Sequence, residues 1–203
     1  MHSEAVRDAA LVKGALHPAA IAADVGAGTG FITRGLALQV ARVYAIDSSP
    51  EMMHVARRNL AAFATVEYRL ADGTALPLPD GSVETVLANM YLHHVSDPLA
   101  AIHEMARLLK SRGRVVITDL DKRAYTWLQE EHHDVWLGFD RGEVETWFEP
   151  AGLLNVQVEA RVNLAPANHR RRKARLLSRF SLLWEPKPDP RAVKGRNSSL
   201  PFL

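Results

Sequence analysis

The sequence predicts an α/β fold in which a parallel sheet is covered by helices on both faces. Two observations carry this prediction. Short apolar runs alternate along the chain with segments whose apolar residues have helical spacing, and no internal repeat of 20 to 50 residues is present. Because the apolar runs are continuous rather than alternating in polarity, we expect strands that are buried on both faces.

We expect strands at the continuous apolar runs, which are residues 20–25, 40–46, 65–70, 83–88, 114–120 and 153–162. Helices are expected over 3–14, 31–39, 50–62, 97–110 and 140–151. The third of these helices begins with Ser49 followed by Pro50, an N-cap residue and a proline whose missing N–H has no helical partner at that position. Asp97-Pro98 and Asp140 mark the starts of the next two.

The composition is that of an ordinary globular chain, with 47% hydrophobic and 24% charged residues. Since 203 residues leave room for one full core, we expect a single domain over residues 1–185. The absence of cysteine excludes disulfides, a thiolate nucleophile and cysteine-ligated metals. No apolar run approaches the ~20 residues that cross a bilayer, and Glu4 and Asp8 stand where a signal peptide is basic. We therefore expect a cytoplasmic protein with no membrane partner.

The formal net charge of +2 hides an asymmetry along the chain. Residues 1–160 carry 14 basic and 21 acidic side chains, whereas residues 161–203 carry 11 basic and 2 acidic ones. The basic segment 169–179 reads as a solvated loop, since no helix-turn-helix or aromatic RNA-binding strand accompanies it, and weak binding of a phosphate backbone is the alternative. Residues 186–203 contain four prolines in a polar sequence, which predicts a poorly ordered tail.

A glycine-rich turn links the first expected strand to the helical pattern that begins at Phe31. It reads Asp24-Val25-Gly26-Ala27-Gly28-Thr29-Gly30. Glycines let the backbone turn sharply and approach a ligand without Cβ collisions, and the helix start behind them offers free N–H groups. An ordinary left-handed turn is the structural alternative, but in an open α/β sheet the crevice beyond the strand ends is the usual binding site.

The spacing of this turn does not fit a phosphate ligand. A dinucleotide-binding pattern would need a small residue where the chain has Phe31 or Thr33, and the P-loop lysine is missing. Asp47 ends the second expected strand, where a carboxylate can accept both hydroxyls of a ribose, and Asp72 follows the third. Three acids without a pyrophosphate pattern indicate a nucleoside that carries positive charge, although Asp47 and Asp72 could instead cap the following helices.

Five segments in the same order resemble the class I S-adenosylmethionine-dependent methyltransferases, in particular the small-molecule branch of ubiquinone and menaquinone C-methyltransferases (methyltransferase type 11). These segments are DVGAGTG at 24–30, AIDSSPEMM at 45–53, ADGTALPLPDGSV at 71–83, LHHVSDP at 92–98 and EMARLLKSRGRVVITDL at 104–120. The resemblance covers residues 15–160 and implies a doubly wound, Rossmann-like, seven-stranded sheet. In that fold, residues 178–184 would form an antiparallel last strand at the sheet edge.

The resemblance implies S-adenosylmethionine as cofactor and assigns it a set of binding residues. Asp24 would act on the ammonium of the methionine end, Asp47 on the ribose, Met52 on the adenine ring and Asp72 on the adenine amino group. The full expected set is Asp24, Gly26, Ala27, Gly28, Thr29, Gly30, Phe31, Asp47, Ser48, Met52, Asp72, Gly73, Thr74, Asn89, Met90 and Tyr91.

Methyl transfer needs a base only when the acceptor atom carries a proton, and His93 and His94 are the nearest titratable candidates. A metal site at these two neighbours is not expected, because adjacent rings rarely face one ion. Tyr125, Trp127 and the pair 132–133 could border the acceptor. A nicotinamide oxidoreductase and a non-catalytic binding module are the rival functions.

The chain departs from the family in two respects. Arsenite methyltransferases need cysteine thiolates, so that substrate is excluded here. About twenty residues precede the first expected strand, which leaves one helix where relatives have a longer cofactor lid. We expect a small, apolar or planar acceptor, and a homodimer that completes the pocket stays open as an alternative.

Overall fold

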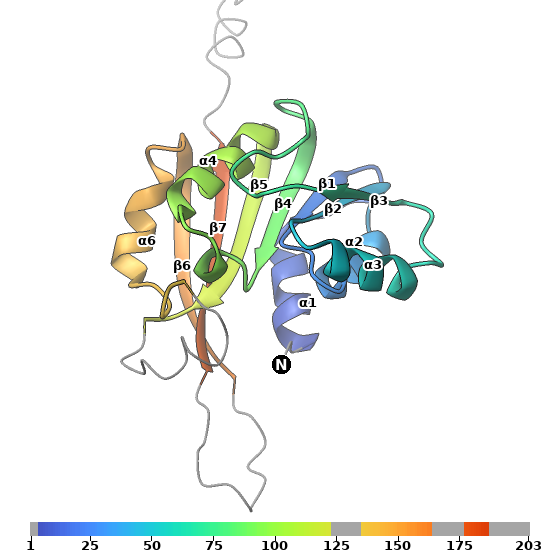
Figure 1. Cartoon of the computed structure of the whole chain (residues 1–203). Coiled ribbons are helices and arrows are strands. Elements are labelled where there is room, and N and C mark those ends of the chain that lie inside the picture. Colours follow the sequence, from blue (N-terminus) through green and yellow to red (C-terminus); the bar gives the residue numbers. More distant parts are fainter. Residues whose placement is uncertain (1–3, 123–134, 164–176, 187–203) are drawn as a thin grey trace, which may run out of the picture.

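The computed structural model describes residues 4–122, 135–163 and 177–186 (Figure 1). The helices are α1 (Glu4–Lys13), α2 (Phe31–Ala37), α3 (Pro50–Asn59), the 3-10 turn η1 (Leu92–His94), α4 (Pro98–Leu108) and α6 (Arg141–Phe148). The strands are β1 (Ile21–Val25), β2 (Arg42–Asp47), β3 (Val66–Leu70), β4 (Val83–Asn89), β5 (Leu109–Leu120), β6 (Leu153–Asn163) and β7 (Leu177–Pro186). The expected tail from residue 187 onward and most of the basic segment lie outside the described residues.

Within the described residues the strands form one sheet in the order β3-β2-β1-β4-β5-β7-β6. The pairs from β3 to β5 are all parallel, and β7 is antiparallel to both β5 and β6. The predicted α/β class and the mostly parallel, doubly wound sheet are confirmed. The position of β7 corrects our expectation, because it lies between β5 and β6 and not at the edge.

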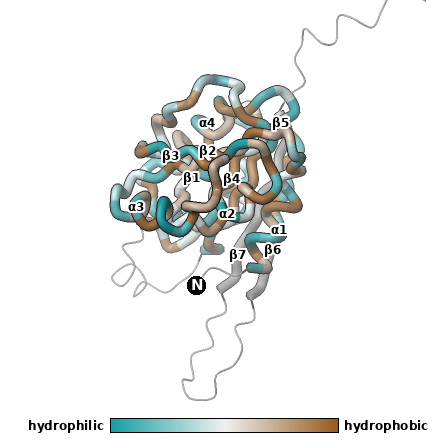
Figure 2. Tube along the Cα trace, turned by 90° about the vertical axis from the view of Figure 1, so that its right-hand side faces the viewer, coloured by the Kyte–Doolittle hydropathy of each residue, from teal (hydrophilic) through white to brown (hydrophobic). Residues whose placement is uncertain are grey.

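Two apolar layers cover the two faces of the sheet. Alternating residues of β5 show the division, since Val116 packs with α1, α2 and α3, whereas Val115 and Ile117 pack with α4 and α6. Figure 2 shows the brown, hydrophobic stretches gathered around the central strands. Burial on both faces is the reason that these strands are continuous apolar runs.

The predicted helix starts are confirmed by their capping contacts. Ser49 Oγ accepts a hydrogen bond from Met52 N at 3.1 Å at the start of α3, and Asp97 Oδ1 accepts from Ala100 N at 2.9 Å at the start of α4. Asp140 accepts from Gly142 N and Glu143 N at the start of α6. Local capping chemistry thus fixes where these helices begin.

The passage from α4 to β5 differs from the prediction. We expected a helix to residue 110 and a break before a strand at 114, but α4 ends at Leu108 and β5 begins at Leu109. The strand absorbs the extra residues through an irregularity opposite β4 between Val83 and Thr85, with Arg112 at a φ of 65°. A bulge of this kind cannot be recognised from apolar periodicity, because it interrupts the pairing without changing the sequence pattern.

Candidate functional site

The candidate site lies at the carboxyl ends of the parallel strands, where the strand order reverses between β1 and β4. The strand registers align these ends, with Val25 beside Ile46 and Ala88, and Asn89 beside Thr118. The turns that follow β1, β2, β3 and β4 therefore meet at one edge. Every residue that the sequence predicted for the cofactor lies in those turns, at the adjoining strand ends or in the first turns of α2 and α3.

The turn after β1 needs glycine because its backbone is left-handed. Gly26, Gly28 and Gly30 have φ values of 73°, 53° and 88°, which residues with a Cβ rarely adopt. Gly26 N and Ala27 N donate to the Ile46 carbonyl at 2.9 and 3.0 Å, which ties the turn to β2. A Cβ on Gly28 would meet no heavy atom of the described residues within 4 Å, so the turn is open on that side.

Asp24 lies in β1 just before this turn, and its carboxyl group is buried. Its Oδ2 accepts a hydrogen bond from Thr33 Oγ1 of α2 at 2.5 Å. Its Oδ1 has no hydrogen-bond partner among the residues that the structure describes. Burial raises the pKa of Asp24 from 3.8 to about 7, against the opposing effect of the Thr33 hydrogen bonds. The base of the turn therefore presents a buried acid with one oxygen unsatisfied.

Asp47 holds the glycine turn from the end of β2. Its Oδ2 accepts a hydrogen bond from Gly28 N at 2.7 Å, and its Oδ1 accepts from Ser49 N at 2.9 Å. The N-cap residue of α3 is Ser49 and not Asp47, so the alternative that Asp47 caps this helix is wrong. The half-buried Asp47 carboxylate is instead the link between the turns after β1 and β2.

Asp72 follows β3 and is exposed. Its Oδ1 accepts hydrogen bonds from both the backbone N and the Oγ1 of Thr74, each at 2.8 Å, and these bonds lower the pKa of Asp72. No helix begins between Asp72 and the start of β4, all of which the structure describes, so the capping alternative is wrong here as well. The carboxylate stays ionised at neutral pH at the outer side of the site.

The end of β4 turns sharply into the site. Asn89 Oδ1 accepts a hydrogen bond from Thr118 Oγ1 at 2.6 Å, and Met90 N donates to the Thr118 carbonyl at 2.7 Å. Met90 has a φ of 55°, an uncommon conformation for a residue with a side chain. The turn directs the Tyr91 ring toward Gly26 and Gly73, both of which its atoms approach closely.

His93 and His94 occupy different environments. His93 is buried, and its Nδ1 lies 2.6 Å from Asp119 Oδ1, whereas His94 is exposed with its ring centroid 4.0 Å from that of His93. Asp119 is fully buried at the end of β5, and its Oδ2 also accepts hydrogen bonds from Tyr91 N and Leu92 N at 3.1 and 2.7 Å. The sequence analysis missed Asp119, although its place at the end of an expected parallel strand could have identified it.

Several expected features lie elsewhere or outside the described residues. Tyr125, Trp127, His132 and His133 fall in the segment that the structure does not describe. Met52 lies in the first turn of α3 with 44% of its surface exposed. In the described ranges no group of three or more acidic or histidine side chains could hold a metal ion, and no helix is long and apolar enough to cross a membrane.

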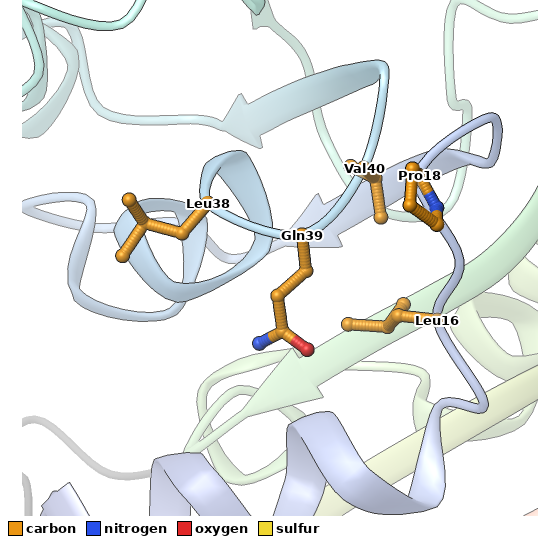
Figure 3. A pocket seen from close by; sticks show the side chains of 5 residues that line it. All are labelled: Leu16, Pro18, Leu38, Gln39 and Val40. Atoms are coloured by element: carbon orange, nitrogen blue, oxygen red, sulfur yellow. The ribbon is translucent and has the colours of Figure 1, made fainter.

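A pocket shown in Figure 3 is separate from this site. It is lined by Leu16, Pro18, Leu38, Gln39 and Val40. These residues precede β1 and β2, so the pocket opens at the amino ends of the strands, opposite the glycine turn. It therefore has no part in the candidate site.

Comparison with known families matches residues 23–117 to a methyltransferase domain. The chain is 41% identical over 96 residues to a demethylmenaquinone methyltransferase of Tropheryma whipplei, a match that covers 47% of this chain and 40% of the relative. It is 38% identical over 108 residues to a ubiquinone biosynthesis O-methyltransferase of Xanthomonas campestris, covering 52% and 45%. The matched segment thus spans less than half the length of these curated relatives.

Solved structures share the fold over most of the described chain. The YcgJ protein of Bacillus subtilis superposes with a TM-score of 0.75 at 19% identity, covering 91% of this chain and 99% of that one. A SAM-dependent methyltransferase of Aquifex aeolicus superposes with a TM-score of 0.67 at 24% identity, covering 89% of each. The matched segment begins inside β1 and ends inside β5, and so contains the turns that form the site. Residues 23–117 therefore match a methyltransferase domain.

Proposed function

We propose that this chain transfers the methyl group of S-adenosylmethionine to a small-molecule acceptor. The observation that carries the proposal is the meeting of a glycine turn, a buried acid with one unsatisfied oxygen and the Asp47 carboxylate at the strand-order reversal of a methyltransferase domain. The chain spans only part of its curated relatives, so the activity is inferred from the site and from their names.

The residues of the site fit the chemistry of this cofactor. Apart from its carboxylate, S-adenosylmethionine carries an ammonium, a sulfonium, a ribose diol and an adenine amino group, all of which are cations or hydrogen-bond donors. The site offers three carboxylates, and Asp24 Oδ1 lacks a partner among the described residues. A phosphate ligand would be repelled by the same carboxylates, which supports the sulfonium nucleoside over a dinucleotide.

The binding roles follow from where each side chain lies. Asp24 and the turn 26–30, which opens into Phe31, would hold the methionine end, with Asn89 and Met90 on its other side. Asp47 and Ser48 would hold the ribose. Met52, Asp72, Gly73 and Thr74 would surround the adenine. When bound, S-adenosylmethionine supplies a methyl group on a positively charged sulfur, so alignment of the acceptor is the main task left to the protein.

His93 is the better candidate for a base, should the acceptor atom carry a proton. Its Nδ1 faces the buried Asp119 carboxylate, so in the neutral ring the proton resides on Nδ1 and the lone pair on Nε2. A buried carboxylate also stabilises the imidazolium that forms on proton uptake. His94 is exposed, whereas His93 is buried beside Asp119, which makes His94 the weaker candidate.

The acceptor that we infer is small, with an apolar or planar portion. Trp136 is 41% exposed, and its Nε1 donates a hydrogen bond to the Val95 carbonyl at 2.8 Å. Its backbone N donates to the His93 carbonyl at 3.1 Å. An aromatic surface therefore adjoins the candidate base. Curated relatives are named demethylmenaquinone methyltransferase, ubiquinone biosynthesis O-methyltransferase and malonyl-acyl-carrier-protein O-methyltransferase. We also propose that residues 1–185 form a single methyltransferase domain with the seven strands described. We propose in addition that the protein acts in the cytoplasm, and a homodimer stays open as an alternative.

An acceptor panel tests this function. The purified chain is incubated with S-adenosylmethionine carrying a labelled methyl group and, in turn, a demethylated naphthoquinol, a phenolic benzoquinone precursor and a malonyl thioester. We expect one acceptor to gain label with stoichiometric release of S-adenosylhomocysteine, and Asp47→Ala to abolish most of that transfer. Turnover of a nicotinamide cofactor by the same protein, with no transfer to any acceptor, would contradict the proposal.

A further inference from the structure

The Tyr91 ring lies across the proposed cofactor site. A Cβ built on Gly26 would overlap the edge of this ring, and a Cβ built on Gly73 would overlap its hydroxyl oxygen. Gly26 follows β1 and Gly73 follows β3, so the ring reaches from one wall of the site to the other. Gly73 has no left-handed φ, which means that Tyr91 and not backbone strain is what excludes a side chain there.

The Tyr91 backbone is fixed by hydrogen bonds, whereas its ring packs against the apolar core and is held at its far end by one hydroxyl contact. Its backbone N donates to Asp119 Oδ2 at 3.1 Å, and the following Leu92 N donates to the same oxygen at 2.7 Å. The hydroxyl is hydrogen-bonded to the Gly73 backbone and faces the carboxylates of Asp47 and Asp72. Burial, with these two carboxylates, raises the pKa of Tyr91, so the phenol is neutral at all working pH values.

The ring and a bound adenosyl group compete for one space. The ribose and adenine contacts proposed above lie at Asp47 and at Gly73, which are the neighbours of the Tyr91 hydroxyl. Since the Asp119 contacts hold the backbone, the side chain can rotate about its own bonds while the turn keeps its shape. The apparent affinity for a ligand falls in proportion to the fraction of molecules whose site is open.

We propose that Tyr91 is a gate of the cofactor site, whose ring closes the space between Gly26 and Gly73 and swings away when S-adenosylmethionine enters. This inference rests on the proposed function. The Asp119 carboxylate contacts both the Tyr91 backbone and the His93 ring, so the turn that carries His93 keeps its place while the Tyr91 ring moves.

Binding of S-adenosylhomocysteine to three purified proteins tests the gate without using activity. Tyr91→Ala removes the competing ring, and Tyr91→Phe is the matched control that keeps the ring and loses only the hydroxyl contact. Calorimetry and stopped-flow fluorescence should show Tyr91→Ala binding about tenfold more tightly, through faster association, with Tyr91→Phe changed by less than about threefold. Tighter binding that arises only from slower dissociation would overturn the gate.

Weaker or unchanged binding by Tyr91→Ala, with wild-type binding intact, overturns the gate but not the proposed function. Tyr91 would then either line the site or have no contact with the ligand. No binding by any of the three proteins overturns the proposed function as well. Should Tyr91→Ala fail to fold, fluorotyrosine NMR of the wild-type chain decides, since its four tyrosines give few signals. The signal that Tyr91→Phe removes should shift on adding S-adenosylhomocysteine, and an unmoved signal in the saturated protein contradicts the gate.

Discussion

Side chains at the glycine turn favour binding at the expense of stability, and Asp24 shows this most directly. A buried carboxyl group with one unsatisfied oxygen is costly to fold, particularly when ionised. Raising its pKa to about 7 leaves part of the population neutral near physiological pH. A cationic ligand group would restore the ionised form, so the same feature that weakens the fold favours the proposed cofactor.

The pH dependence of stability tests the state of Asp24. Because its folded pKa lies above its unfolded value of 3.8, its favourable contribution is complete below that value and is lost as the pH rises toward 7. Asp24→Asn removes this dependence. Urea unfolding should therefore show the variant gaining about 2 kcal/mol relative to the wild type between pH 5 and pH 8. A difference between the two proteins that stays constant with pH would contradict a raised pKa.

The residues of the site were predictable to different degrees. Glycines and acids at strand ends mark Asp24, Asp47 and Asp72 in the sequence, because their positions depend on backbone turns that short motifs encode. The placement of the Tyr91 ring and the pairing of His93 with Asp119 depend on side-chain packing between turns far apart in the chain, which no local pattern encodes. The binding roles themselves stay predictions.

At the scale of elements, Arg107 links helix α4 to the connection between β3 and β4, which begins at the site. Its guanidinium donates to the carbonyls of Leu76 and Leu78 at 2.9 Å each and pairs with Glu104 and Asp80. Glu104 also accepts a hydrogen bond from Leu76 N at 2.9 Å. The connection from β3 to β4 has no helix among the described residues, so these polar contacts, with buried Leu76 and Leu78, hold it in place.

Removing this guanidinium should loosen the connection that begins at Asp72. Arg107→Ala removes the guanidinium from two carbonyls and two carboxylates, and we expect it to lower the free energy of unfolding by about 2 kcal/mol. Arg107→Lys is the control, since it keeps the charge but cannot reproduce the forked contacts, and it should recover less than half of the loss. Equal stability of the wild type and Arg107→Ala in urea titrations would refute this role.

Which segments form helices and which form strands could be predicted from the sequence, whereas the connections between them and the order of the strands could not. Helix starts at residues 50, 98 and 141 were predictable because caps act within three residues. The start of β5 directly after α4, and the place of β7 between β5 and β6, depend on pairing with strands distant in sequence. Apolar periodicity carries no information about which strand is a neighbour.

At the scale of the whole molecule, the strand order determines where the chemistry can occur. The chain runs outward from β1 to β3 and then restarts at β4 on the other side, so the strand order reverses between β1 and β4 (Figure 1). In open α/β sheets, ligands bind at the carboxyl ends of the strands at such a reversal. The doubly wound class could be predicted from alternating runs and from the resemblance. The distinction between a dinucleotide site and a sulfonium nucleoside site came from the missing phosphate pattern and the three acids.

A calorimetric titration tests the central claim that this site binds the adenosyl and amino-acid parts of the cofactor through carboxylates. The wild-type chain is titrated with S-adenosylhomocysteine and, separately, with NAD, and Asp47→Ala is titrated under the same conditions. We predict one S-adenosylhomocysteine per chain, no heat from NAD, and a loss of about 2 kcal/mol in binding free energy for Asp47→Ala, because charge-assisted hydrogen bonds are removed. Saturation by NAD with no binding of S-adenosylhomocysteine would contradict the account.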